Sequence, residues 1–372
     1  MTDRVLIIGG TGRIGGSVAR DIASHTPAEI TIAGRSRAAE SSARVEEDVA
    51  SSVIAKKMRS LALDISNKKE LREAIASHNL VVHCAGPFRY RDARVLEACI
   101  ELGVNYIDVS DDSSFVRLAL AQKKAAEAAG VTAIVSTGVF PGISNSMALQ
   151  GVEQLDSADS IQISYVVSGS GGAGLTVMRT TFLELQHPFQ AWIEGRWQEV
   201  QPYSQREIVE FPAPYHRAAV YWFNTVEAYT LPLLGVKTVT TKFGSVPDFY
   251  NYLTWMVARL PSKWLQNPNT IEFLSRASYS MTEVSDRFTG IGIAMTLEVS
   301  GEKNSQPARY VSTMVHENTA IAAGAGTGSV AEVLLSGEVK KPGVWPVELA
   351  MPTPLFQRTM QQRGIEIESS EF

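Results

Sequence analysis

The chain has few cysteines. Cys84 and Cys99 are the only two among its 372 residues. Both fall in segments that we predict to lie in the core, and their spacing is not that of a zinc site. This excludes the disulfide-rich and zinc-dependent classes, and we expect reduced thiols, a cytoplasmic protein and no metal. As core residues, the two thiols are not expected to act as nucleophiles.

Strong charge and long apolar runs are missing as well. The net charge is −5, and no long basic run occurs, which argues against a nucleic-acid partner. No apolar stretch reaches about 18 residues, so we expect no transmembrane segment. The first predicted strand begins almost at residue 1, so we expect no signal peptide before it.

The most informative motif is a glycine-rich turn near the start of the chain. An apolar strand at 5–8 leads into GGTGRIGG at 9–16, and a helix is predicted directly after it. Gly9 permits a sharp turn, Gly12 lets a pyrophosphate approach the backbone, and Gly15 lets helix and strand pack closely. The N–H groups of the helix N-terminus attract phosphates, although a purely structural turn is the alternative. The residues predicted to bind a dinucleotide here are Gly9, Thr11, Gly12, Arg13 and Ile14.

The end of the second predicted strand indicates which dinucleotide binds. This strand covers 29–33 and is followed by Gly34, Arg35 and Ser36. An NAD-preferring site places a carboxylate here for the ribose 2′-hydroxyl, and none is present. A guanidinium pairs with a 2′-phosphate through two hydrogen bonds, and a hydroxyl adds another. We therefore predict NADP(H) as the cofactor, read by Arg35 and Ser36; the alternative is a surface arginine on an ordinary loop.

Strands and helices alternate over the first part of the chain. Strands are predicted at 5–8, 29–33, 59–63, 80–85, 105–109 and 131–135, and helices at 14–23, 38–53, 68–77, 91–102 and 113–129. This alternation predicts an α/β architecture, a Rossmann domain with a doubly wound parallel sheet. Later segments alternate apolar and polar residues and predict an α+β domain on a mostly antiparallel sheet. We place the divisions at 1–140, 141–318 and 319–372, with the last segment returning to the Rossmann domain.

Two features of the second domain bear on ligands. A second glycine loop, 169–174, precedes a helix that contains Arg179. A helix N-terminus takes an anion and an arginine clamps a carboxylate, so Gly172 and Arg179 are predicted to bind a substrate carboxylate. The alternative is a flexible connection. Residues 215–265 are rich in aromatics, for which we expect core positions and a homodimer interface, with a membrane-touching surface or an apolar pocket as the alternative.

Four segments resemble the saccharopine dehydrogenase-like NADP-dependent reductases. They are GGTGRIGG with AGRS, VVHCAGPF with VLEACIELGVNYIDVSDD, STGVFPGISNSMA, and VAEVLLSGEVKKPGVWPVE. Such enzymes join an amino-acid semialdehyde to an amine and reduce the resulting imine with NADPH. The chain looks most similar to the dehydrogenases that form carboxynorspermidine, carboxyspermidine or carboxyaminopropylagmatine from aspartate β-semialdehyde. The resemblance implies an oxidoreductase of CH–NH bonds in polyamine synthesis, with agmatine or a diamine as the amine.

The reaction implied by this resemblance needs a cofactor and an amine held at the carboxyl ends of the strands. There we expect the cofactor to be bordered by Asp64, Ala85, Gly86 and Pro87. A plain turn at Gly86-Pro87 is the alternative. Phe88 directly follows and is expected to contact the substrate.

Acid–base chemistry is expected after the fifth strand. Asp108, Asp111 and Asp112 follow one another there, and Asp111 is our candidate for holding the amine and moving protons. Asp112 is expected to contact the substrate or, alternatively, to cap the following helix. The cationic end of the amine needs carboxylates or aromatic faces. Candidates are Glu184, Tyr221, Trp222, Glu227, Asp248 and Glu283.

Two further functions fit the same residues. One is a saccharopine reductase-like enzyme, or another NADPH reductase that acts on an apolar substrate. The other is a non-catalytic NADP-binding scaffold or redox sensor, which would bind NADPH without turnover. The glycine turn alone does not separate them, because it recognises the cofactor and not the substrate.

Overall fold

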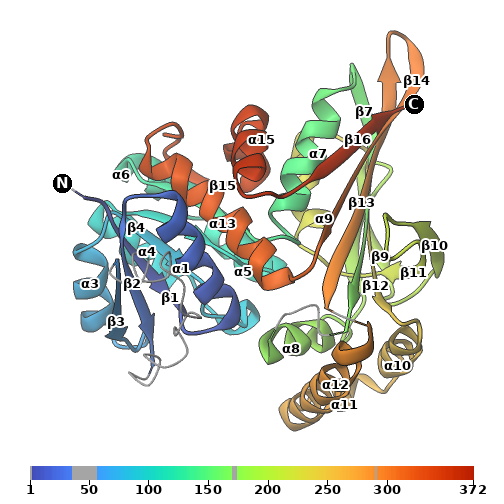
Figure 1. Cartoon of the computed structure of the whole chain (residues 1–372), viewed down its shortest axis with the longest axis horizontal. Helices are drawn as coiled ribbons and strands as arrows, with labels where there is room; N and C mark the ends of the chain where they lie inside the picture. The colour runs from blue at the N-terminus through green and yellow to red at the C-terminus, as the bar shows by residue number, and fades with distance from the viewer. Residues whose placement is uncertain (1, 36–56, 170–173, 290) are drawn as a thin grey trace. The chain divides into compact units, whose positions relative to one another are not determined.

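A computed structural model describes residues 2–35, 57–169, 174–289 and 291–372. Within them the chain forms two compact units (Figure 1). The first comprises residues 1–143 and 320–363, and the second comprises residues 144–319 and 364–372. The helix predicted at 38–53 lies outside the described residues.

The first unit is built on a parallel seven-stranded sheet. Its strands are β1 (Arg4–Ile8), β2 (Glu29–Gly34), β3 (Met58–Ala62), β4 (Leu80–His83), β5 (Asn105–Asp108), β6 (Thr132–Val135) and β15 (Gly343–Pro346). They lie in the order β15-β6-β5-β4-β1-β2-β3. The strand order reverses between β1 and β4, which are paired neighbours in the sheet with Ile8 beside His83. The predicted Rossmann domain is confirmed, and ligands of such sheets bind beyond the strand ends at this reversal.

Helices cover both faces of this sheet, as its parallel connections require. They are α1 (Arg13–His25), α3 (Lys68–Ala76), α4 (Arg94–Leu102), α5 (Ser113–Leu120), α6 (Lys123–Ala129), α13 (Thr319–Leu335), α14 (Val347–Ala350) and α15 (Thr353–Gln362). A short 3₁₀ helix, Phe88–Tyr90, follows β4. The prediction of a single helix at 113–129 is wrong in one respect. The helix is interrupted at Ala121 and Gln122, which divide it into α5 and α6.

Helix α13 packs very closely within the first unit, and its glycines allow this close approach. A Cβ at Gly324 would lie 2.9 Å from the backbone of Ser17 in α1. A Cβ at Gly326 would lie 2.4 Å from the carbonyl oxygen of Gly138. Neither distance leaves room for a side chain, so this late segment fits directly against the helix that follows the glycine turn.

The second unit is built on a mixed seven-stranded sheet in the order β10-β11-β12-β7-β13-β14-β16. Its strands are β7 (Ser157–Ser168), β10 (Glu207–Glu210), β11 (Arg217–Trp222), β12 (Thr238–Val246), β13 (Gly292–Lys303), β14 (Gln306–His316) and β16 (Ile367–Glu371). Apart from the parallel pair β12–β7, all neighbours are antiparallel, so the predicted α+β domain on a mostly antiparallel sheet is confirmed. A separate hairpin joins β8 (Phe189–Ile193) to β9 (Arg196–Val200).

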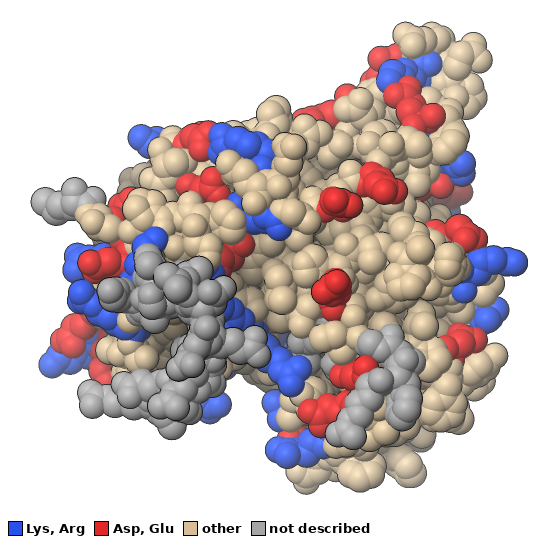
Figure 2. Space-filling view, in the orientation of Figure 1, with Lys and Arg blue, Asp and Glu red and all other residues tan. Residues whose placement is uncertain are grey.

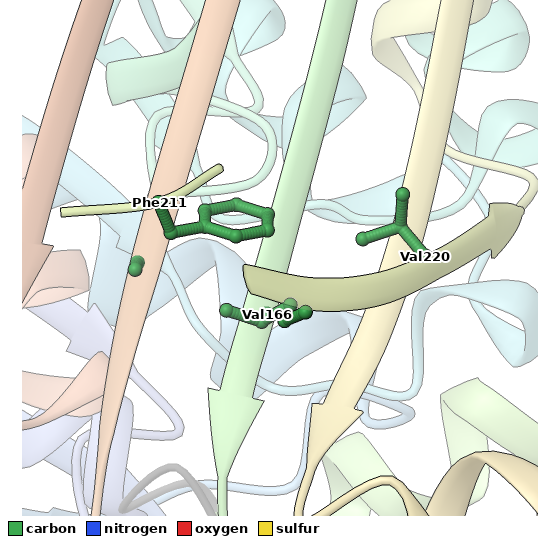
Figure 3. Close-up of a cluster of buried hydrophobic side chains, with 5 residues drawn as sticks. Val166, Phe211 and Val220 are labelled. Carbon is green, nitrogen blue, oxygen red and sulfur yellow. The ribbon is translucent and has the colours of Figure 1, made fainter. Parts of the chain in front are cut away.

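The helices of the second unit are α7 (Ile143–Glu153), α8 (Leu175–Leu183), α9 (Glu227–Thr230), α10 (Phe249–Val257), α11 (Ser262–Leu265) and α12 (Pro268–Thr289). One buried cluster shows how the sheet is covered (Figure 3). Phe211 lies on the segment after β10 and packs over the sheet against Val166 of β7 and Val220 of β11. Ala218 and Ala294 complete the cluster. Burial of such side chains is the main stabilising term of the unit.

The end of the chain departs from expectation. We expected all of 319–372 to return to the Rossmann domain, but residues 364–372 belong to the second unit. There β16 pairs antiparallel with β14, from Met314 beside Ile367 to Tyr310 beside Glu371. This edge strand is held by backbone hydrogen bonds and is largely exposed, so no apolar pattern announced it.

Candidate functional site

The glycine turn after β1 forms a tight cradle. Gly9 has φ +81°, and a Cβ there would lie 2.8 Å from the backbone of Ala85, on the segment after β4. A Cβ at Gly15 would lie 2.4 Å from the Gly9 carbonyl oxygen. Gly12 is the N-cap of α1 and provides no side-chain cap. The cradle therefore fits a dinucleotide, because it brings an uncapped helix N-terminus to the point where the strand order reverses.

The end of β2 lies against this cradle. A Cβ at Gly34 would lie 2.7 Å from the side chain of Thr11, so β2 and the glycine turn are in contact. Arg35 follows directly, while Ser36 lies outside the described residues. Nearby, hydrogen bonds from Ser66 lower the pKa of Asp64, and the charges of Arg35 and Arg94 lower it further. Arg35 therefore sits in a corner shared by the ends of β2, β3 and β4.

A second arginine in this corner, Arg91, was missed by the sequence analysis. Its Nε donates a hydrogen bond of 2.7 Å to the Ala85 carbonyl, and its Nη2 donates one of 3.2 Å to the Gly86 carbonyl. Burial lowers the pKa of Arg91, and the neighbouring charges of Arg35 and Arg94 lower it further. Arg94 is instead paired with Asp92 through both carboxylate oxygens. Arg91 thus braces the segment after β4 and keeps its positive charge near Arg35.

The carboxyl ends of β4 and β5 carry a buried polar cluster. His83 Nδ1 lies 3.1 Å from the Tyr106 hydroxyl, and the rings of Phe88 and Phe115 contact His83 edge-on. Burial lowers the pKa of His83 to about 3, with the charge of Arg91 as a second cause. His83 is therefore neutral at physiological pH. Phe88, a predicted substrate contact, is buried in this cluster.

Asp108 organises the turn after β5. Its Oδ1 accepts hydrogen bonds from the Ser110 N–H (3.0 Å), the Ser110 hydroxyl (2.6 Å) and the Ser136 N–H (2.8 Å). Its side chain is fully buried, and burial raises the pKa of this carboxyl. Asp108 therefore ties the end of β5 to the end of β6, which makes it a structural residue of this edge.

The two aspartates that follow differ in their surroundings. Asp112 is the N-cap of α5, where its Oδ1 accepts the N–H groups of Ser114 (2.9 Å) and Phe115 (3.1 Å). Its other oxygen lies 3.8 Å from Arg89. The alternative of a helix cap is thus observed for Asp112. Asp111 is only half-buried, directly beyond the strand end, and its role in proton transfer stays a prediction.

In the second unit, Arg179 on α8 is already engaged. Its Nε and Nη2 donate hydrogen bonds of 2.7 and 2.9 Å to the carboxylate of Glu272 on α12. These bonds, with those from Arg276, lower the pKa of Glu272 to about 2. A substrate carboxylate would have to compete with Glu272 for Arg179. The other predicted member of this site, Gly172, lies outside the described residues.

Two of the candidate carboxylates for an amine are buried. Glu227 on α9 is fully buried and accepts a hydrogen bond of 2.7 Å from the Ser144 hydroxyl. Burial raises its pKa. Glu184 is also buried and accepts a hydrogen bond of 2.5 Å from the Asn224 amide. Asp248, in contrast, pairs at the surface with Arg206.

The described residues contain no group of three or more His, Cys, Asp or Glu placed to hold a metal ion. Within the same part of the chain, no helix combines the length and the apolar character needed to cross a membrane. Cys84 and Cys99 are both free, and burial raises the pKa of each thiol. Neither thiol is activated as a nucleophile.

The chain is similar in sequence to known proteins. Residues 5–134 match the family model of the saccharopine dehydrogenase NADP-binding domain. The chain is 25% identical to carboxynorspermidine synthase of Vibrio cholerae, over 96% of this chain and 94% of that protein. It is 26% identical to a bovine saccharopine dehydrogenase-like oxidoreductase over 64% of this chain and 58% of that protein, and it spans about half the length of its mammalian relatives.

A solved structure supports the fold. Yeast saccharopine dehydrogenase (L-Glu forming) superposes with a TM-score of 0.68 over the full length of both chains, at 12% identity. The fold and the glycine cradle together define a Rossmann protein that binds NADP(H). The match of residues 5–134 to the saccharopine dehydrogenase NADP-binding domain confirms both the predicted resemblance and the predicted cofactor.

Proposed function

We propose that the protein is an NADPH-dependent reductase that condenses L-aspartate β-semialdehyde with agmatine or a diamine and reduces the imine to a secondary amine. The observation that carries this proposal is the end-to-end similarity to carboxynorspermidine synthase, which extends across both units. The mammalian matches cover only 64% and 46% of this chain and are named for their likeness to saccharopine dehydrogenase. Catalysis of this kind places the reaction in polyamine synthesis.

In this proposal the first unit positions the cofactor. The glycine cradle and the N-terminus of α1 would hold the pyrophosphate, and Arg35 would bind the 2′-phosphate with the positive charge of Arg91 nearby. Bound NADPH supplies the hydride. Asp111 accepts a proton from the incoming amine and returns one as water leaves the carbinolamine, a role that suits its half-buried position at the strand end.

The proposal is tested by incubating the purified protein with NADPH, the semialdehyde and each amine in turn. We expect NADPH oxidation that depends on both substrates, and a product whose mass is that of the reduced conjugate. Oxidation with an apolar ketone or imine, and none with any amine, would favour the reductase of apolar substrates. Tight NADPH binding without turnover of any pair would favour the scaffold.

A pair of variants tests Asp111. Asp111→Asn should lower turnover about 10²-fold or more while NADPH affinity stays the same. Asp112→Asn is the matched control, because asparagine is also a good N-cap and preserves α5. Equal loss in both variants would indicate a structural effect and not proton transfer.

A further inference from the structure

Helix α10 differs from an ordinary surface helix in which of its side chains are buried. Of its nine residues, Asn251 alone is buried. The Asn251 amide accepts hydrogen bonds of 2.7 Å from the Tyr203 hydroxyl and from the Ser245 N–H, and it donates one of 2.7 Å to Asp248. A surface helix normally turns its apolar face inward and its polar face outward. Here a polar side chain anchors the helix, and four large apolar side chains are exposed, namely Phe249, Tyr252, Trp255 and Met256.

Exposed apolar side chains continue along the two helices that follow, with Trp264 on α11 and Phe273 on α12. Eight of the sixteen exposed large hydrophobic side chains in the described residues lie between 249 and 284. Single exposed apolar residues are ordinary, whereas a concentration of this kind marks a contact surface. We call it the α10–α12 patch, formed by Phe249, Tyr252, Trp255, Met256, Trp264 and Phe273.

The aromatics predicted together at 215–265 therefore divide into two groups. Tyr221, Trp222, Phe223 and Phe243 are buried, which confirms the core prediction for them. The later ones are not, since 60% of Trp264 and 57% of Phe249 are exposed. The core of the unit does not account for this second group.

The carboxylates at the two ends of the patch, Asp248 and Glu272, are each paired with an arginine, and the charged residues between them are positive. Between 249 and 271 the charged residues are Arg259 and Lys263, in a chain whose net charge is −5. Both are exposed, and the Arg259 guanidinium lies 4.0 Å from the centre of the Trp255 ring. The next acid, Glu272, is paired with Arg179 and Arg276. Figure 2 shows mainly uncharged surface at the lower right, where Figure 1 places α10, and both acidic and basic side chains farther left, toward α8 and α12.

This charge pattern separates two possible occupants. In a symmetric dimer this patch would face the same patch of the other copy, where Arg259 and Lys263 would meet carboxylates, Asp248 and Glu272, that are already paired with arginines. A membrane surface offers phosphate groups to these cations and an apolar boundary to the rings. Trp, Tyr and Phe beside Lys and Arg are also the side chains that favour this boundary.

We propose that the α10–α12 patch docks the protein peripherally on membranes that contain anionic lipid. The rings of Trp255 and Trp264 enter the interfacial layer, and Arg259 and Lys263 bind the lipid phosphates. The substrate proposal does not bear on this surface, so either can fail without the other.

The experiment is co-sedimentation of the full chain with vesicles of phosphatidylcholine alone or mixed with phosphatidylglycerol. We expect binding to the mixed vesicles that weakens as salt is raised, with a shift of tryptophan fluorescence to shorter wavelength. Trp255→Ser with Trp264→Ser should weaken binding about tenfold or more. Arg259→Glu with Lys263→Glu should abolish the preference for phosphatidylglycerol.

Matched controls come from β9, where Arg196 and Trp197 are an exposed adjacent pair outside the patch. Arg196→Glu and Trp197→Ser should bind vesicles as the unaltered protein does. No binding to mixed vesicles, or equal binding by the patch variants, would overturn the proposal. So would a dimer in sedimentation that dissociates in the double tryptophan variant without any lipid binding. If circular dichroism shows that the double tryptophan variant is misfolded, the proposal is decided by the charge-reversal variant, whose substitutions are at exposed positions.

Discussion

His83 should make the first unit less stable as the pH falls. Its pKa is about 3 in the folded protein, mainly through burial, and 6.5 is its ordinary value. The buried neutral histidine makes its full contribution to stability above about pH 6.5. Below that pH the contribution declines, because protons bind this histidine in the unfolded chain but not in the folded protein. At about pH 5 the unfolded histidine is almost fully protonated and the folded one is not, which amounts to roughly 2 kcal/mol relative to about pH 7.5.

The measurement compares urea unfolding of the unaltered protein and His83→Leu at these two pH values. The variant should lose about 1 kcal/mol at both pH values, because the hydrogen bond between His83 and the Tyr106 hydroxyl is removed, but its stability should lack the acid-dependent part. The exposed His187, replaced by Gln, is the control. The reasoning is refuted if the pH dependence is the same in His83→Leu, or if NMR shows the His83 ring titrating near 6.5.

Three further predictions follow from the charges. Arg35→Ala should weaken NADPH and 2′,5′-ADP binding in calorimetry far more than NADH binding, by roughly tenfold or more, whereas equal losses would exclude a contact with the 2′-phosphate. Arg363→Met should cost about 3–5 kcal/mol in urea unfolding, because the buried Arg363 pairs with Asp21 (2.9 Å) and Glu332 (2.8 Å), which would be left uncompensated. Glu227 has a pKa raised above 4.5 by burial, so its stabilising effect declines as the pH rises. The thermal midpoint of Glu227→Gln should therefore rise relative to that of the unaltered protein between about pH 4.5 and pH 8. A difference between the two midpoints that stays constant over this range would contradict the raised pKa.

The parallel sheet was predictable because its buried strands read as short continuous apolar runs, as β1 and β4 do. Strands β9 and β10 were missed because most of their side chains are exposed or half-exposed, which leaves little alternation. The helix α12 was missed for another reason. Ser275 and Thr282 are buried on its inward side, so its apolar periodicity is broken by polar residues.

Local and distant contacts explain what could be predicted of the site. The glycine turn is read from neighbouring residues, because its conformation depends on positions only a few residues apart. The role of Arg91 was not predictable from the sequence, because it depends on where the fold places the carbonyl groups of Ala85 and Gly86. The partner of Arg179 could not be foreseen either, because Glu272 is 93 residues away along the chain.

The discontinuous first unit has a consequence for how the protein is made. Its sheet gains β15 beside β6, and its first helix gains α13, from residues translated after residues 144–319 of the second unit. At about 5–20 residues per second, the 176 residues 144–319 take roughly 10–35 s to synthesise. During that interval the nascent glycine turn leaves the ribosome without the helix that packs against it. The nucleotide-binding unit is therefore begun first and completed late, after most of the second unit has been synthesised.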